Sequence, residues 1–175
     1  MSEFIPVLTK KEIDAQVSHI AQVISADYKD RELILIGILK GAFIFLSDLI
    51  RQLSIPVKVD FMCAASYGGS TASSGRIKLS KDVDIDIHNK DVLIVEDIVD
   101  TGHTLKYLMG LFESHRAASV KTAALVRKAE RAEVDVIVDY LGFDIGDEWV
   151  VGYGLDYAEQ NRTLPYIGVV TPDDA

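Results

Sequence analysis

The spacing of hydrophobic positions along this chain changes repeatedly between runs typical of strands and three-to-four spacings typical of helices. The predicted strands are Leu33–Leu39, Val57–Phe61, Arg76–Leu79, a run that begins at Val92, Val120–Val126 and Val134–Leu141. The predicted helices carry their apolar faces at Ile13–Ile24, Phe43–Leu53 and Leu105–Phe112. Strands that alternate with helices predict an α/β fold with a mainly parallel twisted sheet flanked by helices. Ligands of such sheets bind at the carboxyl ends of the strands.

The length of the chain favours a single domain. Its 175 residues are long enough to bury a sizeable core, and no repeat or interdomain linker is visible, so we expect residues 1–175 to form one domain. Thr9 and Glu12 form a predicted capping box at the start of the first helix.

Composition and charge exclude several classes of protein. Hydrophobic residues make up 49% and charged residues 26%, which is ordinary for a soluble globular domain. The net charge of −9 argues against general affinity for nucleic acid or anionic membranes. Cys63 is the only cysteine, and neither a signal peptide nor a transmembrane run is visible. We therefore expect a cytoplasmic protein that binds neither nucleic acid nor membranes.

The segment Val92–Thr104, V-L-I-V-E-D-I-V-D-T-G-H-T, carries the most chemistry in the chain. Glu96 and Asp97 interrupt an apolar strand, where burying a carboxylate without a partner is costly. Asp100 then precedes the hydroxyl and glycine residues that open a helix, at Thr101, Gly102 and Thr104. A helix start attracts phosphate, whereas carboxylates suit sugar hydroxyls, a cation or a proton. The segment therefore predicts a site for a phosphorylated sugar.

This string resembles the phosphoribosyl-pyrophosphate (PRPP) loop of the type I phosphoribosyltransferases, and the hypoxanthine–guanine phosphoribosyltransferases most of all. Further matches follow in the family's order over nearly the whole chain. They are L-K-G at Leu39–Gly41, the pair Ser66-Tyr67, Lys128, and the string W-V-V-G-Y-G-L-D-Y at Trp149–Tyr157. The resemblance implies the type I fold with a small hood built from the two ends of the chain. It also implies a purine salvage enzyme that uses PRPP and a 6-oxopurine as substrates and Mg²⁺ as cofactor, working as a homodimer or homotetramer.

The resemblance assigns the PRPP-binding roles to the central motif. Asp100 is the expected general base, which removes the proton from purine N7 as N9 attacks the ribose. Glu96 and Asp97 are expected to hold the ribose hydroxyls or the water shell of the metal. The 5′-phosphate is expected to bind at the helix start, formed by Thr101, Gly102, His103 and Thr104.

The other matches supply the pyrophosphate, metal and purine subsites. The pyrophosphate is expected to bind at Leu39, Lys40, Gly41 and Arg162, and relatives can hold a cis peptide between the first two of these residues. Asp156 is expected to bind Mg²⁺ together with Glu96 and Asp97. The purine is expected to contact Lys128 through its O6, the ring of Trp149 and the backbone of Val150. Ser66 and Tyr67 are expected to begin a lid, Ser66–Gly75, that closes over the site.

The sequence departs from the family pattern at two positions. Trp149 stands where relatives commonly have Phe, which leaves the preferred size of the substrate open. Arg127 replaces an apolar or acidic neighbour of the family's purine-binding lysine, so we assign that role to Lys128.

Three alternatives remain open at this point. D-T-G is also the signature of aspartic proteases, but those proteins are all-β and place it after uninterrupted apolar residues. An RNA-binding regulator on the same fold would need a strong basic face, which the charge of −9 disfavours. A transferase for xanthine, adenine or a pyrimidine is the most serious rival. Lys128 and the Trp149–Tyr157 string favour 6-oxopurines without ranking hypoxanthine, guanine and xanthine.

Overall fold

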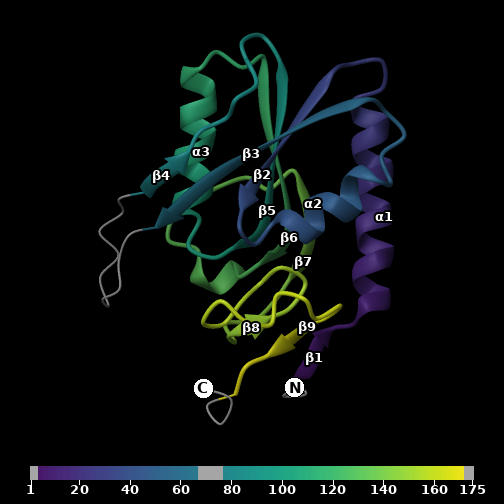
Figure 1. The fold of residues 1–175 in the computed structure, drawn as a ribbon, viewed down its shortest axis with the longest axis vertical. Helices are drawn as coiled ribbons and strands as arrows, with labels where there is room; N and C mark the ends of the chain where they lie inside the picture. The colour runs from purple at the N-terminus through teal and green to yellow at the C-terminus, as the bar shows by residue number, and fades with distance from the viewer. Residues whose placement is uncertain (1–3, 67–76, 172–175) are drawn as a thin grey trace.

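A six-stranded twisted sheet forms the centre of the molecule in the computed structural model, which describes residues 4–66 and 77–171 (Figure 1). The strand order is β4-β3-β2-β5-β6-β7, and every pair is parallel except the antiparallel pair of β3 and β4. The strands are β2 (Leu33–Leu39), β3 (Val57–Ser66), β4 (Ile77–Lys81), β5 (Asp91–Val99), β6 (Ser119–Arg127) and β7 (Tyr140–Asp144). The predicted α/β fold with a mainly parallel sheet is confirmed.

Helices cover both faces of this sheet, and each face has its own apolar cluster. On one side lie α1 (Lys10–Asp27) and α2 (Phe43–Ile50), and on the other lies α3 (His103–Ser114) (Figure 1). Leu33 and Leu35 of β2 pack in the cluster of α1 and α2, whereas Ile34 and Ile36 pack in the cluster of α3. A strand buried on both faces needs apolar residues at every position, which explains the continuous run in the sequence.

The start of α1 follows from its first few residues. The backbone N–H of Glu12 donates to Thr9 Oγ1 at 3.3 Å, and the backbone N–H of Thr9 donates to Glu12 Oε2 at 2.8 Å. The predicted capping box is therefore confirmed. The helix buries Ile13, Val17, Ile20 and Ile24, which are the residues of its predicted apolar face.

A second, smaller sheet joins the two ends of the chain. Its order is β1-β9-β8, with antiparallel pairing between β1 (Ile5–Leu8), β9 (Ile167–Val169) and β8 (Val150–Val151). Figure 1 shows this sheet beyond the carboxyl ends of the central strands. It forms the expected hood over the edge of the sheet where the sequence places the ligand site.

One predicted strand is wrong over most of its length. Val134–Leu141 was expected to pair throughout, but β7 begins only at Tyr140. The preceding residues lie against the α3 side of the core, where Val136 and Val138 pack without joining the sheet. The backbone of this segment is hydrogen-bonded by a side chain of β6, because the hydroxyl of Thr122 donates to the carbonyl of Ile137 at 2.8 Å. An apolar run thus predicted burial correctly and pairing incorrectly.

Two other predicted segments lie partly outside the described residues. The strand predicted at Arg76–Leu79 is β4, Ile77–Lys81, and Arg76 itself lies outside the described residues. Ser66 ends β3, while Tyr67 and the rest of the predicted lid up to Gly75 also lie outside them. Among the helices in residues 4–66 and 77–171, none is both long enough and apolar enough to cross a membrane.

Candidate active site

The carboxyl edge of the sheet gathers the predicted site residues, because three parallel strands end there side by side. β2 ends at Leu39, β5 carries Glu96 and Asp97 near its end, and β6 leads into Lys128. The backbone N–H of Lys128 donates to the carbonyl of Val99 at 2.9 Å, which ties the purine segment to the PRPP loop. Strand register therefore brings together residues that are far apart in the sequence.

The predicted phosphate loop turns from β5 into α3 at Gly102. Gly102 is the N-cap of α3 and has a φ of +86°. Because glycine has no side chain, no side chain caps the first turn at that position. A Cβ there would lie 3.0 Å from Val134 Cγ2, so both the space and the backbone conformation favour glycine. The result is a helix start suited to phosphate, as the sequence predicts.

The other loop residues surround this turn. Thr101 is half-buried, and its carbonyl accepts the backbone N–H of Glu133 at 3.0 Å. His103 begins α3, and its ring Nε2 lies 2.8 Å from the carboxylate of Glu133. That contact holds ring Nε2 of His103 against Glu133, while Thr104 follows His103 in the first turn. No motif in the sequence indicates the supporting role of Glu133, which lies thirty residues farther along the chain.

Two adjacent carboxylates, buried Glu96 and half-buried Asp97, lie next to the phosphate loop. Burial raises the pKa of Glu96 well above its usual range, and the neighbouring charge of Asp97 adds to this effect. Burial also raises the pKa of Asp97 to about 6, against the opposing effect of backbone N–H groups and of Arg162. Because both groups lose water, this edge favours a cation, a hydroxyl donor or a proton.

The L-K-G segment approaches Asp97 closely. A Cβ on Gly41 would lie 1.6 Å from Asp97 Oδ2, so only glycine fits between this loop and the carboxylate. The peptide between Leu39 and Lys40 is cis. Gly154, with φ of +103°, lies against the same loop, since a Cβ there would be 2.1 Å from the carbonyl oxygen of Gly41. The L-K-G segment and the turn after β8 therefore lie side by side.

That turn brings the predicted pyrophosphate and metal residues together. Arg162 Nη2 lies 2.8 Å from Asp156 Oδ1, and Arg162 Nη1 donates to the carbonyl of Gly154 at 2.9 Å. Glu159 Oε2 lies 3.1 Å from Arg162 Nη2 and 2.8 Å from Lys40 Nζ. The sequence analysis did not single out Glu159, and the only signal for it was its place between Asp156 and Arg162.

The three predicted metal ligands do not form a cage by themselves. Among the described residues, no group of three or more His, Cys, Asp or Glu side chains is placed to hold a metal ion. Asp156 nevertheless lies near enough to raise the pKa of Asp97 by its charge. Such a sparse acidic set suits a Mg²⁺ ion that takes most of its oxygen ligands from water and substrate phosphates.

The predicted general base, Asp100, has an arginine partner that the sequence analysis did not assign. Asp100 Oδ1 accepts from Arg131 Nε at 2.5 Å, and Arg131 Nη1 lies 3.1 Å from Asp147 Oδ1. The carboxylate is half-exposed and faces a hollow of about 410 Å³, which Gly102 also lines. Asp100 is thus reachable from solvent next to the phosphate loop.

The predicted purine residues form a second group at this edge. Lys128 is buried, with Nζ 3.4 Å from the carbonyl oxygen of Asp147 and 5.9 Å from the centre of the Trp149 ring. Trp149 is 69% exposed, so it is not a core residue, and Val150 beside it is buried in β8. Arg127 pairs instead with Asp144 at 2.7 Å. Lys128 and the open face of Trp149 therefore lie together, as a flat heterocycle would require.

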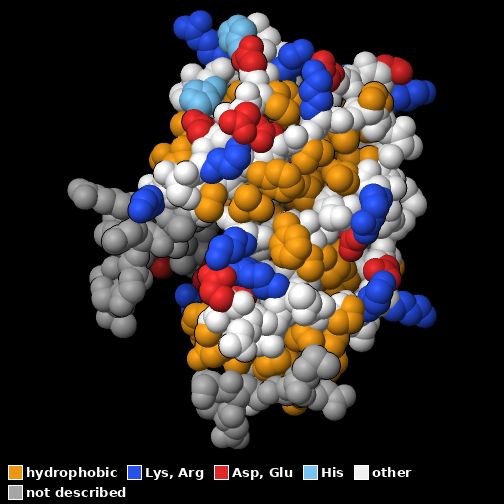
Figure 2. Space-filling model, viewed as in Figure 1, with side chains coloured by type: hydrophobic (Ala, Val, Ile, Leu, Met, Phe, Trp, Pro, Cys, Tyr) orange, Lys and Arg blue, Asp and Glu red, His pale blue; other side chains and the backbone are white. Residues whose placement is uncertain are grey.

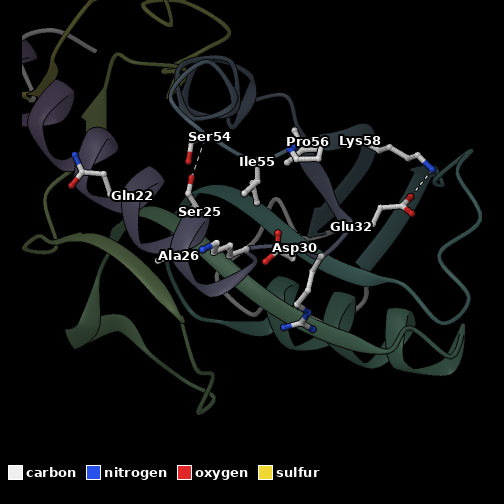
Figure 3. Close-up of a pocket in the computed structure, with 12 residues that line it drawn as sticks. Gln22, Ser25, Ala26, Asp30, Glu32, Ser54, Ile55, Pro56 and Lys58 are labelled. Carbon is white, nitrogen blue, oxygen red and sulfur yellow. Dashed lines mark hydrogen bonds and ion pairs between the residues drawn. The ribbon is translucent and has the colours of Figure 1, made fainter.

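A larger hollow, of about 1020 Å³, lies at the opposite edge of the sheet (Figure 3). It lies where β2 and β3 begin, and none of the predicted site residues lines it. Two of its charged groups pair with each other, since Lys58 Nζ lies 2.5 Å from Glu32 Oε1. Ser54 likewise donates its backbone N–H to Ser25 Oγ at 3.0 Å. Size alone therefore does not mark the active site of this molecule.

Comparisons with known proteins show the family to which the chain belongs. The model of the phosphoribosyl transferase domain family matches residues 7–158. A hypoxanthine-guanine phosphoribosyltransferase of Dictyostelium discoideum is 49% identical, with 93% of this chain and 92% of that protein covered.

Solved structures extend the likeness to the fold. A hypoxanthine phosphoribosyltransferase of Staphylococcus aureus is 42% identical with a TM-score of 0.92, covering 96% of this chain and 91% of that one. A hypoxanthine phosphoribosyl transferase of Trypanosoma cruzi is 39% identical with a TM-score of 0.92, covering 99% of this chain and 95% of that one. The chain therefore belongs to the phosphoribosyltransferase family, in its hypoxanthine–guanine branch.

Proposed function

We propose that the protein transfers the 5-phosphoribosyl group of PRPP to hypoxanthine or guanine, giving IMP or GMP and pyrophosphate. One observation carries this proposal: a single edge of the sheet holds groups suited to each part of the substrates. They are the phosphate loop, the acid pair Glu96 and Asp97, the cations Lys40 and Arg162, and the purine residues Lys128 and Trp149. A phosphate, a ribose, a pyrophosphate and a purine each find a matching group there. The names of the relatives support the same reaction.

Binding of PRPP would use the two ends of this edge. The 5′-phosphate binds at the start of α3, where Gly102 leaves the helix end open. Glu96 and Asp97 face the ribose between the phosphates. Lys40 and Arg162 bind the pyrophosphate, and their positive charge stabilises the negative charge that this group gains as its bond to C1 breaks.

Proton transfer would use Asp100. As N9 of the purine attacks C1 of the ribose, the proton on N7 passes to the carboxylate of Asp100. Arg131 Nε holds Asp100 Oδ1 in the structure, so the proton would pass to the other carboxylate oxygen, Oδ2. Lys128 donates to O6 of the purine, which makes the ring easier to deprotonate, and Trp149 covers one face of the ring.

We also propose Mg²⁺ as the cofactor, held by Asp156 with Glu96 and Asp97 nearby. Bound there, the ion would neutralise part of the charge of the pyrophosphate group. The open acidic set described above fits this use, since a substrate would complete the shell of oxygen ligands. Lys40 and Arg162 bind the outer oxygens of the same group.

A homodimer or homotetramer remains a proposal. The work on the Trypanosoma cruzi relative concerns the role of its C-terminal region in oligomeric state and activity. In this chain, Figure 2 shows hydrophobic side chains gathered across the middle of one face, over β3 and α2. Phe43 of α2 is 42% exposed, and Val57 and Val59 of β3 are half-buried. This face offers a second copy an apolar surface to cover.

Several expectations from the sequence stay predictions. They are the cytoplasmic location, the single domain over residues 1–175, the absence of nucleic-acid and membrane partners, and the lid that begins at Ser66 and Tyr67. The rival hypothesis, a transferase for xanthine, adenine or a pyrimidine, differs only in the base that is used. Measuring activity with each base therefore distinguishes the two.

A panel of bases tests the proposed function. The purified protein is mixed with PRPP, Mg²⁺ and one base, and pyrophosphate release is followed. We expect release with hypoxanthine and guanine and none with adenine, uracil or no base. Release with xanthine, adenine or uracil but not with hypoxanthine or guanine would replace this proposal with the rival transferase, and no release with any base would reject it.

A further inference from the structure

Glu159 bridges the two cations that the proposed function assigns to pyrophosphate. Its Oε2 lies 2.8 Å from Lys40 Nζ and 3.1 Å from Arg162 Nη2. Lys40 follows β2, whereas Arg162 belongs to the turn after β8, and 119 positions separate Lys40 from Glu159. One carboxylate oxygen thus joins both sides of the subsite.

The backbone presents Glu159 in this position. Ala158 and Glu159 have φ of +50° and +63°, which non-glycine residues adopt uncommonly. The backbone N–H of Glu159 donates to Asp156 Oδ2 at 2.9 Å, so the predicted metal ligand also fixes the turn. The side chain itself is 66% exposed and is held mainly by the two cations.

Stabilising the fold is a weak explanation for this bridge. Lys40 and Glu159 have 63% and 66% of their side-chain surface exposed, and ion pairs between exposed groups add little to stability. A carboxylate oxygen between an ammonium and a guanidinium makes the same charge-assisted hydrogen bonds as a phosphate oxygen. The chemistry of the contact therefore matches that of the predicted ligand.

We propose that Glu159 is an internal competitor of pyrophosphate, which holds Lys40 and Arg162 when the subsite is empty and is displaced when a pyrophosphate group binds. This inference rests on the proposed function. Because the ligand binds only where both ion pairs are broken, its apparent affinity is its intrinsic affinity multiplied by the fraction of molecules in which the bridge is open. The same bridge re-forms as the product leaves, which favours release of pyrophosphate.

Binding of inorganic pyrophosphate tests the inference directly. Titration calorimetry with and without Mg²⁺ compares the wild-type protein with Glu159→Gln, which removes the charge and keeps the size. We expect the variant to bind pyrophosphate about 2- to 30-fold more tightly, the combined range for losing the two ion pairs of the exposed Glu159 carboxylate. We also expect slower dissociation in a stopped-flow displacement experiment.

Glu32→Gln is a matched control. Glu32 also bridges two lysines, at 2.5 Å from Lys58 Nζ and 3.2 Å from Lys90 Nζ, but it lies at the opposite edge of the sheet. Glu32→Gln removes the same charge from the protein. If its affinity for pyrophosphate is unchanged, the gain in Glu159→Gln is a local effect and not a result of the lower net negative charge. An equal gain in Glu32→Gln would overturn the inference.

A double-mutant cycle adds a second test. In a Lys40→Gln background only Arg162 remains to be released, so the gain from Glu159→Gln should shrink. If the wild-type protein binds pyrophosphate and Glu159→Gln binds it equally or more weakly, the inference is wrong and Glu159 merely positions the turn. If the wild-type protein neither binds pyrophosphate nor forms nucleotide, the proposed function fails instead.

Discussion

The two edges of the central sheet differ in how well their charged groups are satisfied. At the amino edge, beside the larger hollow, Glu32 pairs with Lys58 and Lys90 while its side chain stays exposed. At the carboxyl edge the hollow is smaller, but loss of water raises the pKa values of Glu96 and Asp97. Ionisable groups with strongly shifted pKa values indicate an active site better than the volume of a hollow does. The following changes test this difference between the edges, in order of decreasing effect.

Removing the proposed base should have the largest effect. Asp100→Asn should lower kcat by about 10²- to 10⁴-fold, the range of general acid–base catalysis, with little change in PRPP affinity. Asp30→Asn is the control at the amino edge, because Asp30 lines the larger hollow and asparagine tolerates its φ of +62°. Steady-state kinetics should show a loss only in Asp100→Asn. Near-full kcat in that variant, with chemistry rate-limiting, would remove Asp100 from its role.

Adding a methyl group at Gly41 should lower activity by displacing the L-K-G segment. Gly41→Ala would push the L-K-G segment away from Asp97, and displacement of a binding loop by about 1 Å can cost about 10²-fold in kcat/KM. Gly110→Ala is the matched control, because a Cβ there has no neighbour within 4 Å. It should keep full activity and raise the free energy of unfolding by about 0.5–1 kcal/mol. Equal activity of the two variants would contradict the close fit at Gly41.

The acid pair Glu96 and Asp97 should make stability depend on pH in an unusual direction. Because the pKa of Asp97 rises from 3.8 to about 6 on folding, the folded state binds its proton more tightly than the unfolded state does. Stability contributed by this group is therefore highest below pH 4 and falls as the pH rises to about 6. Asp97→Asn should be more stable than the wild type at pH 8, by up to about 3 kcal/mol, and this difference should vanish below pH 4.

Urea unfolding with a metal chelator present measures this effect. Asp60 provides the control, since it is buried but backbone N–H groups of Ile85, Phe61 and Asp84 lower its pKa despite its burial. Asp60→Asn should therefore destabilise the protein at neutral pH. If both variants were destabilised to the same extent, the carboxyl edge would not differ from an ordinary satisfied site.

Trp149 should give the smallest effect of the four. Trp149→Ala should raise the KM for the base by roughly one to two decades through lost stacking, whereas Trp149→Phe should keep most activity. Neither should unfold the protein, because the side chain is 69% exposed. Since this is the only tryptophan, nucleotide should change its fluorescence saturably. Unchanged emission at saturating nucleotide would remove Trp149 from the purine subsite.

The sequence predicted most strands of the central sheet and the motif positions, because local patterns encode both, but it did not predict the hood strands β1, β8 and β9. The run Leu33–Leu39 matches β2 residue for residue, and the acid pair and glycine loop occupy the expected end of β5. It did not show that Arg131 holds Asp100 or that Glu159 joins Lys40 to Arg162. These contacts depend on turns that place distant side chains together, and no periodicity records them. Val134–Leu141 failed for a related reason, since burial of an apolar run does not require pairing.

The hood also bears on the order in which the molecule assembles. β1 pairs with β9 through partners such as Ile5 and Val169, near opposite ends of the described chain. Such a non-local pairing closes the largest loop in the protein, so we expect it to form last and to open first. The central sheet would then outlast the hood, and hydrogen exchange should release the amides of β1 before those of β5. Loss of base binding would thus be an early sign of unfolding, before the phosphate loop itself is disturbed.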